Sequence, residues 1–179
     1  KWMLGVADYF DIVIGNPPYI KEYTNRNAFD GLRTSPYYQG KMDIWYLFAC
    51  KGLDLVHPET GVLTFIATNN WTTNAGASIF RDKITRDAKI LQMIDFGDYK
   101  IFESADIQTM VMLFKRSHGP AEYLFDLRRN CRPDANWELA SKLLTKEGSA
   151  GLEYATPVFI RKKMKGKLFV FAEDKAERI

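Results

Sequence analysis

The chain has 179 residues, which is long enough for one domain with a sizeable hydrophobic core. Hydrophobic residues make up 46% and charged residues 26%, as in ordinary globular proteins, and the net charge of +3 permits nucleic-acid binding without indicating it. No signal peptide and no apolar run of about 20 residues is visible, and the two cysteines are far apart. These features argue against membrane, disulfide-rich and zinc-binding proteins, so we expect a cytoplasmic protein without a metal site.

The first predicted element is a buried strand of a parallel sheet over residues 10–14, which are rich in β-branched side chains. It ends at Gly15, because the two prolines that follow Asn16 permit neither a helix nor a continued strand. In an open α/β sheet, ligands bind in the loops that leave the carboxyl ends of the strands. Asn16 and Tyr19 are therefore expected at a ligand-binding edge.

The side chains of this loop suit the handling of a flat base that carries an exocyclic amino group. If the Asn16 side-chain oxygen and the Pro17 carbonyl accept hydrogen bonds from that group, its lone pair is freed for attack on an electrophilic carbon. The same two dipoles stabilise the positive charge that develops on nitrogen. Tyr19 offers a stacking face for the base, a contact worth about 1–3 kcal/mol.

The sequence Asn16-Pro17-Pro18-Tyr19 after a strand resembles the catalytic motif of the S-adenosylmethionine-dependent DNA adenine-N6 methyltransferases of restriction-modification systems. The resemblance implies that Asn16, Pro17 and Tyr19 are catalytic and that Pro18 contacts the substrate. It further implies a type II enzyme that uses S-adenosylmethionine as cofactor and methylates a flipped adenine in double-stranded DNA. RNA and protein-glutamine amino-group methyltransferases carry the same tetrapeptide and remain alternatives, as does a Pro-Pro loop in an unrelated α/β protein.

Residues 20–41 form a long loop without clear periodicity, in which basic residues and tyrosines are interleaved. Two interpretations are open: a lid that contacts phosphates and an extruded nucleotide, or a surface loop whose tyrosines pack beneath it. Apolar residues at helical spacing then predict a helix over 42–56. The resemblance implies that residues 40–48 close over the adenine of the cofactor and that Phe48 contacts it, although an aromatic at this spacing is also typical of the core.

A strand is predicted over 61–68, followed by a short helix over 75–86. Asn69, Asn70 and Trp71 lie at the carboxyl end of that strand. They resemble the next motif of the family, which implies that they are pocket-wall residues. A turn with an Asx cap is the alternative interpretation of the asparagines.

Two further strands are predicted over 90–96 and 107–115, too close together for a crossover helix and therefore antiparallel. The resemblance implies that Phe102, in the connection between them, packs against the flipped adenine. A hairpin residue packed into the core is the alternative. The resemblance also implies that strand 107–115 lies between strands 61–68 and 90–96 in the sheet.

The composition changes at the Gly-Pro pair that follows residue 118, which divides the chain into 1–117 and 118–179. The first part is expected to be the C-terminal half of a methyltransferase catalytic domain, and the second a connector and the start of a target-recognition region. In the second part we predict strands over 123–127, 156–160 and 167–171, a helix over 136–146 and a basic run over 161–167. That run either contacts DNA phosphates or is a solvated surface.

The expected fold class is α/β, a partial class I methyltransferase (Rossmann-like) sheet with a final antiparallel hairpin, lacking the N-terminal cofactor-binding half. The chain does not begin with Met and shows no glycine-rich cofactor loop, which the family places upstream of Asn16, so this fragment alone is expected to be inactive. Strand 10–14 would then have a bare apolar edge, so we expect the chain to associate with itself or to cover that edge with another segment. The alternative of another class is a non-catalytic DNA-binding or assembly module.

Overall fold

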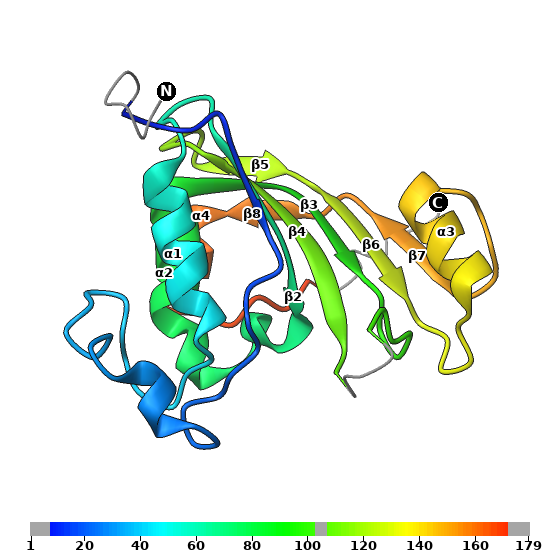
Figure 1. Ribbon diagram of the computed structural model, residues 1–179. Helices are drawn as coiled ribbons and strands as arrows, with labels where there is room; N and C mark the ends of the chain where they lie inside the picture. The colour runs from blue at the N-terminus through cyan, green and yellow to red at the C-terminus, as the bar shows by residue number, and fades with distance from the viewer. Residues whose placement is uncertain (1–7, 103–106, 172–179) are drawn as a thin grey trace.

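The computed structural model describes residues 8–102 and 107–171, which form a six-stranded mixed sheet in the order β1-β2-β4-β3-β6-β7 and a two-stranded sheet of β5 and β8 (Figure 1). The strands are β1 (Ile12–Gly15), β2 (Val62–Thr68), β3 (Ala88–Asp95), β4 (Thr109–Arg116), β5 (Glu122–Leu124), β6 (Asp126–Asn130), β7 (Leu152–Ala155) and β8 (Val158–Ile160). β2 pairs parallel with β1 and antiparallel with β4, and β4 pairs antiparallel with β3. The predicted α/β class, the antiparallel hairpin and the order of β1 to β4 are confirmed.

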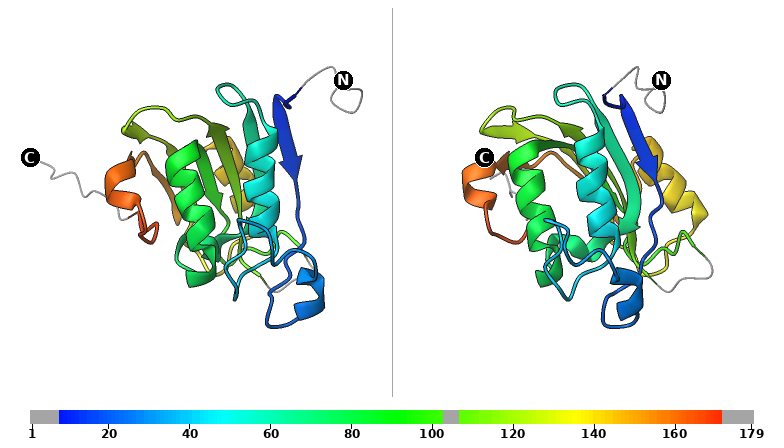
Figure 2. Two further views of the ribbon diagram at one scale, coloured as in Figure 1. Left: turned by 90° about the vertical axis from the view of Figure 1, so that its left-hand side faces the viewer. Right: turned by 60° about the vertical axis from the view of Figure 1, so that its left-hand side comes forward.

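Helices cover both faces of the main sheet (Figures 1 and 2). α1 (Trp45–Leu55) and α2 (Ser78–Asp87) lie on one face, and α3 (Trp137–Thr145) packs on the other face beside β6. The shorter helical turns are η2 (Arg26–Phe29), η3 (Asn69–Thr72), η4 (Ala75–Ala77) and α4 (Arg161–Met164).

Trp45, Trp71 and Phe80 are almost completely buried and in ring contact, so aromatic packing fills the core beneath α1 and α2. Within residues 8–102 and 107–171, no helix has the length and apolar character needed to cross a membrane.

β1 is an edge strand, and among residues 8–102 and 107–171 it pairs only with β2. The prediction that this strand is buried was wrong for one of its faces: Val13 packs against the core, whereas Ile12 is 64% and Ile14 is 78% exposed. Successive side chains of a strand point to opposite faces, and α1 covers only the face that holds Val13. An exposed apolar edge is free to pair, so self-association through β1 stays a prediction.

The part of the chain after residue 117 departs most from the predicted elements. The strand expected over 123–127 is divided between β5 and β6, and β6 extends the main sheet by pairing parallel with β3. Residues 167–171 do not form the expected strand. Phe169 and Phe171 are buried there, and Phe169 N donates to Thr72 O at 2.8 Å, so aromatic burial holds this segment without strand pairing. The division of the chain at 117/118 stays a prediction.

The contact between η4 and the residues just before α1 leaves no room for a side chain at Gly76. A Cβ atom there would lie 2.2 Å from Lys41 O and 3.0 Å from Met42 Cα. Gly76→Ala should therefore lower the free energy of unfolding by about 2 kcal/mol, as overpacking against main chain does. Urea denaturation followed by tryptophan fluorescence measures the loss. Gly148→Ala is the control because open space surrounds Gly148, and equal stability of the two variants would contradict this packing.

Candidate functional site

The Asn-Pro-Pro-Tyr loop leaves β1 at the carboxyl edge of the sheet, beside β2. Proline has no N–H, so the loop depends on side chains to hold it in place. The Tyr19 hydroxyl lies within donating distance of two acceptors, Asn16 Oδ1 at 2.6 Å and Ile66 O on β2 at 2.9 Å. Tyr19 thereby attaches the loop to the neighbouring strand and orients the Asn16 amide.

Asn16 stays available to a ligand in this arrangement. Asn16 is exposed, whereas Tyr19 is half-buried and Pro17 is buried. A carbonyl oxygen has two lone pairs, so Asn16 Oδ1 can accept a second hydrogen bond while it accepts that of Tyr19. The amide expected from the sequence to act on a ligand is therefore neither turned inward nor fully used by the protein.

A cavity of about 360 Å³ opens beside this loop, between β1, β2 and α1. Asn16, Pro17 and Pro18 line it together with Phe48, which is 48% exposed. A cavity of this size with an open aromatic face suits a purine ring. The described residues that line it carry no carboxylate, so these walls do not supply the acidic ligand for a ribose that the resemblance places upstream.

Phe102 reaches the same edge of the sheet from the connection between β3 and β4, and it is partly exposed. The ring centroids of Tyr19 and Phe102 are 6.3 Å apart, and the ring planes are inclined by 54°. A base stacked between two rings needs about 7 Å between them, from two carbon–carbon separations of about 3.5 Å. The two rings are in tilted contact with each other, so they must move apart and become parallel to hold a base between them.

Asp43, two residues before the start of α1, is a buried acidic group to which no function is assigned from the sequence. It is 3% exposed, and burial raises the pKa of its carboxyl to about 6 although nearby main-chain N–H groups and Lys21 lower it. Burial and then the charge of Asp43 raise the pKa of the Tyr19 hydroxyl to about 12, which keeps that hydroxyl a hydrogen-bond donor. The sequence feature that could have indicated a buried acidic group is the position of this aspartate between the apolar residues Met42 and Ile44.

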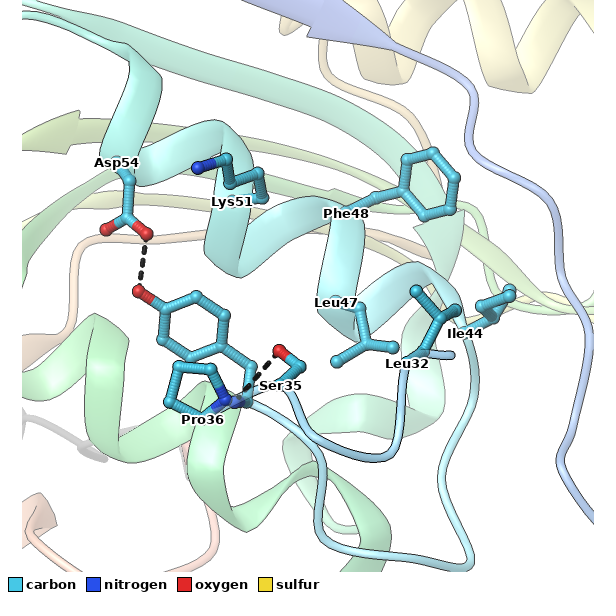
Figure 3. A pocket seen from close by; sticks show the side chains of 9 residues that line it. Leu32, Ser35, Pro36, Ile44, Leu47, Phe48, Lys51 and Asp54 are labelled. Carbon is cyan, nitrogen blue, oxygen red and sulfur yellow. Dashed lines mark hydrogen bonds between the residues drawn. The ribbon is translucent and has the colours of Figure 1, made fainter. Parts of the chain in front are cut away.

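A second cavity, of about 500 Å³, lies between α1 and residues 32–37 of the long loop (Figure 3). Tyr37 borders it and donates a hydrogen bond to Asp54, which also accepts one from Lys83 at 2.7 Å. These bonds connect the loop to α1 and α2. Phe48 lines both cavities and separates the second from the Asn-Pro-Pro-Tyr loop.

The loop 20–41 shows features of both interpretations that the sequence left open. Phe29 is fully buried, and Tyr37 and Tyr38 pack against the core, as expected for a loop anchored by its aromatic residues. Tyr23 is 71% exposed and remains accessible to a partner. The loop is therefore a packed segment with one exposed tyrosine.

The residues that follow β2 support the edge of the sheet. Trp71 is fully buried, with its indole N–H 3.2 Å from Met110 Sδ, so the interpretation as a pocket-wall residue was wrong for Trp71. Asn69 donates to Asp95 Oδ1 at 3.0 Å and thereby connects the ends of β2 and β3. A tryptophan next to polar residues gives no sequence signal that distinguishes a core position from a pocket wall.

Comparisons with known proteins point to one group of enzymes. Residues 2–102 match the family model described as Eco57I restriction-modification methylase. Over 101 residues, which are 56% of this chain, the chain is 24% identical to the type II methyltransferase M.BanIII of Aneurinibacillus aneurinilyticus and spans 17% of the length of that protein.

The chain also has a fold similar to that of several solved structures. The type I methyltransferase subunit from Streptococcus thermophilus matches with a TM-score of 0.58 and 15% identity, over 97% of this chain and 40% of its own. The DrdV–DNA complex matches with a TM-score of 0.55 and 15% identity, over 98% of this chain and 20% of its own. At such identities the likeness shows the fold alone. The family model, however, covers more than half of the 179 residues, and the chain therefore belongs to the Eco57I restriction-modification methylase family.

Proposed function

We propose that the chain is the base-handling part of a type II restriction-modification enzyme that transfers a methyl group from S-adenosylmethionine to adenine N6 in double-stranded DNA. The observation that carries the proposal is the position of Asn16 Oδ1, which Tyr19 orients at a cavity lined by Pro17, Pro18 and Phe48. Family membership supports methyl transfer in a restriction-modification system. The choice of adenine N6 rests on the chemistry of this loop, and the type II assignment on the likeness to M.BanIII.

The first task of the site is to make a weak nucleophile reactive. The lone pair of an adenine amino group is delocalised into the ring. Asn16 Oδ1 and the Pro17 carbonyl oxygen each accept a hydrogen bond from this group, which localises the lone pair on nitrogen. Both dipoles also stabilise the positive charge that nitrogen gains as its new bond to carbon forms. The side chains thus act by position and charge, without a covalent bond to the base.

The second task is to hold the base outside the duplex. Tyr19 and Phe102 stack on its two faces after it rotates out of the helix, and Pro18 contacts its edge. Tyr19 is only half-buried, so part of the residue is accessible for this contact. Double-stranded DNA is the proposed partner, and DrdV, which shares the fold, was solved as a complex with DNA.

The third task is to place the cofactor beside the base. S-adenosylmethionine supplies an electrophilic methyl group when it is bound. Phe48 is the residue that would contact its adenine, because this exposed ring lines the cavity that also contains Asn16, Pro17 and Pro18. The walls of this cavity lack a carboxylate, so we expect that the chain alone neither binds the ribose tightly nor transfers methyl groups.

Replacement of Asn16 tests the central assignment. Asn16→Ala in the full-length protein should lower kcat about 100-fold or more, which is the usual effect of removing one dipole aimed at a developing charge. The Michaelis constant for duplex DNA should change little, because phosphate contacts supply most of the binding energy. Transfer of labelled methyl groups to a DNA duplex, followed by mass spectrometry of the nucleosides, measures both the rate and the methylated atom.

Two controls make this experiment decisive. Asn16→Asp keeps an oxygen acceptor and should retain more activity than Asn16→Ala. RNA and protein are offered to the same enzyme in parallel, since related enzymes methylate such amino groups. Full activity of Asn16→Ala would remove this amide from the mechanism, and methyl transfer to RNA or protein but not to DNA would overturn the substrate assignment.

The two roles of Tyr19 can be separated by a pair of variants. Tyr19→Phe loses the hydrogen bonds to Asn16 and Ile66 but keeps the ring, so kcat should fall about tenfold while the base is still held. Tyr19→Ala also loses the stacking face, so binding of the flipped base should weaken by about 1–3 kcal/mol. The fluorescence of 2-aminopurine at the target position reports base binding. Equal fluorescence changes in the two variants would argue against stacking on Tyr19.

A further inference from the structure

The carboxylate of Asp43 is buried and only weakly satisfied. It is 3% exposed, and the main-chain N–H groups of Ile20, Ile44 and Trp45 lie close enough to lower its pKa, but none forms a hydrogen bond of regular geometry with either oxygen atom. Buried charges are normally paired or hydrogen-bonded, because removal of an ion from water is unfavourable by several kcal/mol. Lys83 differs from Asp43 in this respect, because this buried cation forms ion pairs with both Asp54 and Asp87. A weakly satisfied charge beside a candidate site requires an explanation.

The groups around Asp43 connect it to the methyl-transfer site. Its charge raises the pKa of Tyr19, which carries the hydrogen bond to Asn16, and also that of Tyr46, whose buried hydroxyl has no hydrogen-bond partner in the described residues. Lys21 is the cation that acts on Asp43, and Arg81 on α2 acts on Tyr46. Asp43 forms an antiparallel bridge with Lys21, and Ile44 N donates to Ile20 O at 2.9 Å, so Asp43 lies beside the segment that directly follows Tyr19.

We propose, on the basis of the proposed function, that Asp43 is a positioning residue for methyl transfer, whose negative charge acts through Tyr19 to stabilise the positive charge that develops on the amino nitrogen. A charge near a reacting atom is more effective in a partly buried site than in water, because water screens it less there. The nitrogen gains this charge as its lone pair forms the new bond to the methyl carbon; the bond from that carbon to the sulfonium sulfur of the donor would break at the same time, with its electron pair left on sulfur. The nitrogen keeps the charge until its proton leaves for solvent. Asp43 is suited to this role because its charge is already fixed and desolvated before the base arrives.

A purely structural role for Asp43 is the competing explanation. The residue stands two positions before α1, and its main-chain oxygen accepts a hydrogen bond from Tyr46 N at 3.1 Å, so its side chain could help to cap the helix. Asparagine is as good a cap as aspartate but carries no charge. Asp43→Asn therefore preserves a structural role and removes only the electrostatic one.

The first experiment compares the full-length wild-type protein with Asp43→Asn. At saturating DNA and cofactor, wild-type kcat should rise through about pH 6 as the carboxylate ionises. In Asp43→Asn, kcat should be about tenfold lower above that pH and should lose this rise, with an unchanged Michaelis constant for DNA. Asp11→Asn, which removes an exposed charge from the opposite end of β1, is the matched control and should keep both.

Thermal melting supplies a readout that does not depend on activity. The folded protein keeps a proton on Asp43 up to about pH 6, whereas the unfolded chain releases it near the ordinary value for aspartate. The wild-type protein therefore loses stability as the pH rises through this window. Asp43→Asn lacks that loss and should melt several degrees higher than wild type at pH values above it.

The second experiment shifts the titration without touching Asp43. Lys21 lowers the pKa of Asp43, so Lys21→Met should move the rise in kcat to higher pH. This variant keeps the test decisive if Asp43→Asn does not fold. An unshifted profile, or wild-type kcat and melting behaviour in Asp43→Asn, would overturn the inference while leaving the proposed function intact. Absence of methyl transfer by the wild-type enzyme would overturn the proposed function and this inference with it.

Discussion

The absence of N–H groups at Pro17 and Pro18 is the constraint on which the arrangement of the site depends. A turn with two consecutive prolines cannot fix itself through its own main-chain hydrogen bonds, so its neighbours must hold it. Tyr19 attaches the turn to β2, and Ile20 O accepts a hydrogen bond from Ile44 N at 2.9 Å. The turn is thereby held between a strand and the start of α1. Such attachment matters because small displacements of a reacting group have large effects on rate.

The same attachment explains why a charge lies buried at this point. Lys21 and Asp43 face each other in an antiparallel bridge, so the segment that fixes the turn also brings the carboxylate into the core. Other buried charges of the protein are satisfied: Arg81, for example, donates 2.6 Å hydrogen bonds to the main-chain oxygens of Trp71 and Asn74. The carboxylate of Asp43 lies beside the segment that follows Tyr19, a region where function rather than stability commonly determines the residue.

The sheet order brings together parts of the site that lie far apart in the sequence. β4 runs antiparallel to β2 and pairs Thr109 with Thr68, so its start lies at the carboxyl end of β2. Phe102 precedes β4 and therefore reaches the edge at which Tyr19 emerges. α1 returns across the same face and supplies Phe48. The turn and α1 thus line a purine-sized cavity, and the hairpin brings Phe102 into ring contact with Tyr19 at the same edge of the sheet.

The sequence by itself determined the turn and its place at the end of a strand, because proline geometry and β-branched residues act locally. With the family resemblance it also predicted the sheet order and the edge at which Phe102 lies. Only the tertiary structure decided which groups are satisfied or buried: the bond from Tyr19 to Ile66, the burial of Asp43 and the exposure of Ile12 and Ile14. These properties depend on contacts between residues far apart in the chain, which local patterns do not specify.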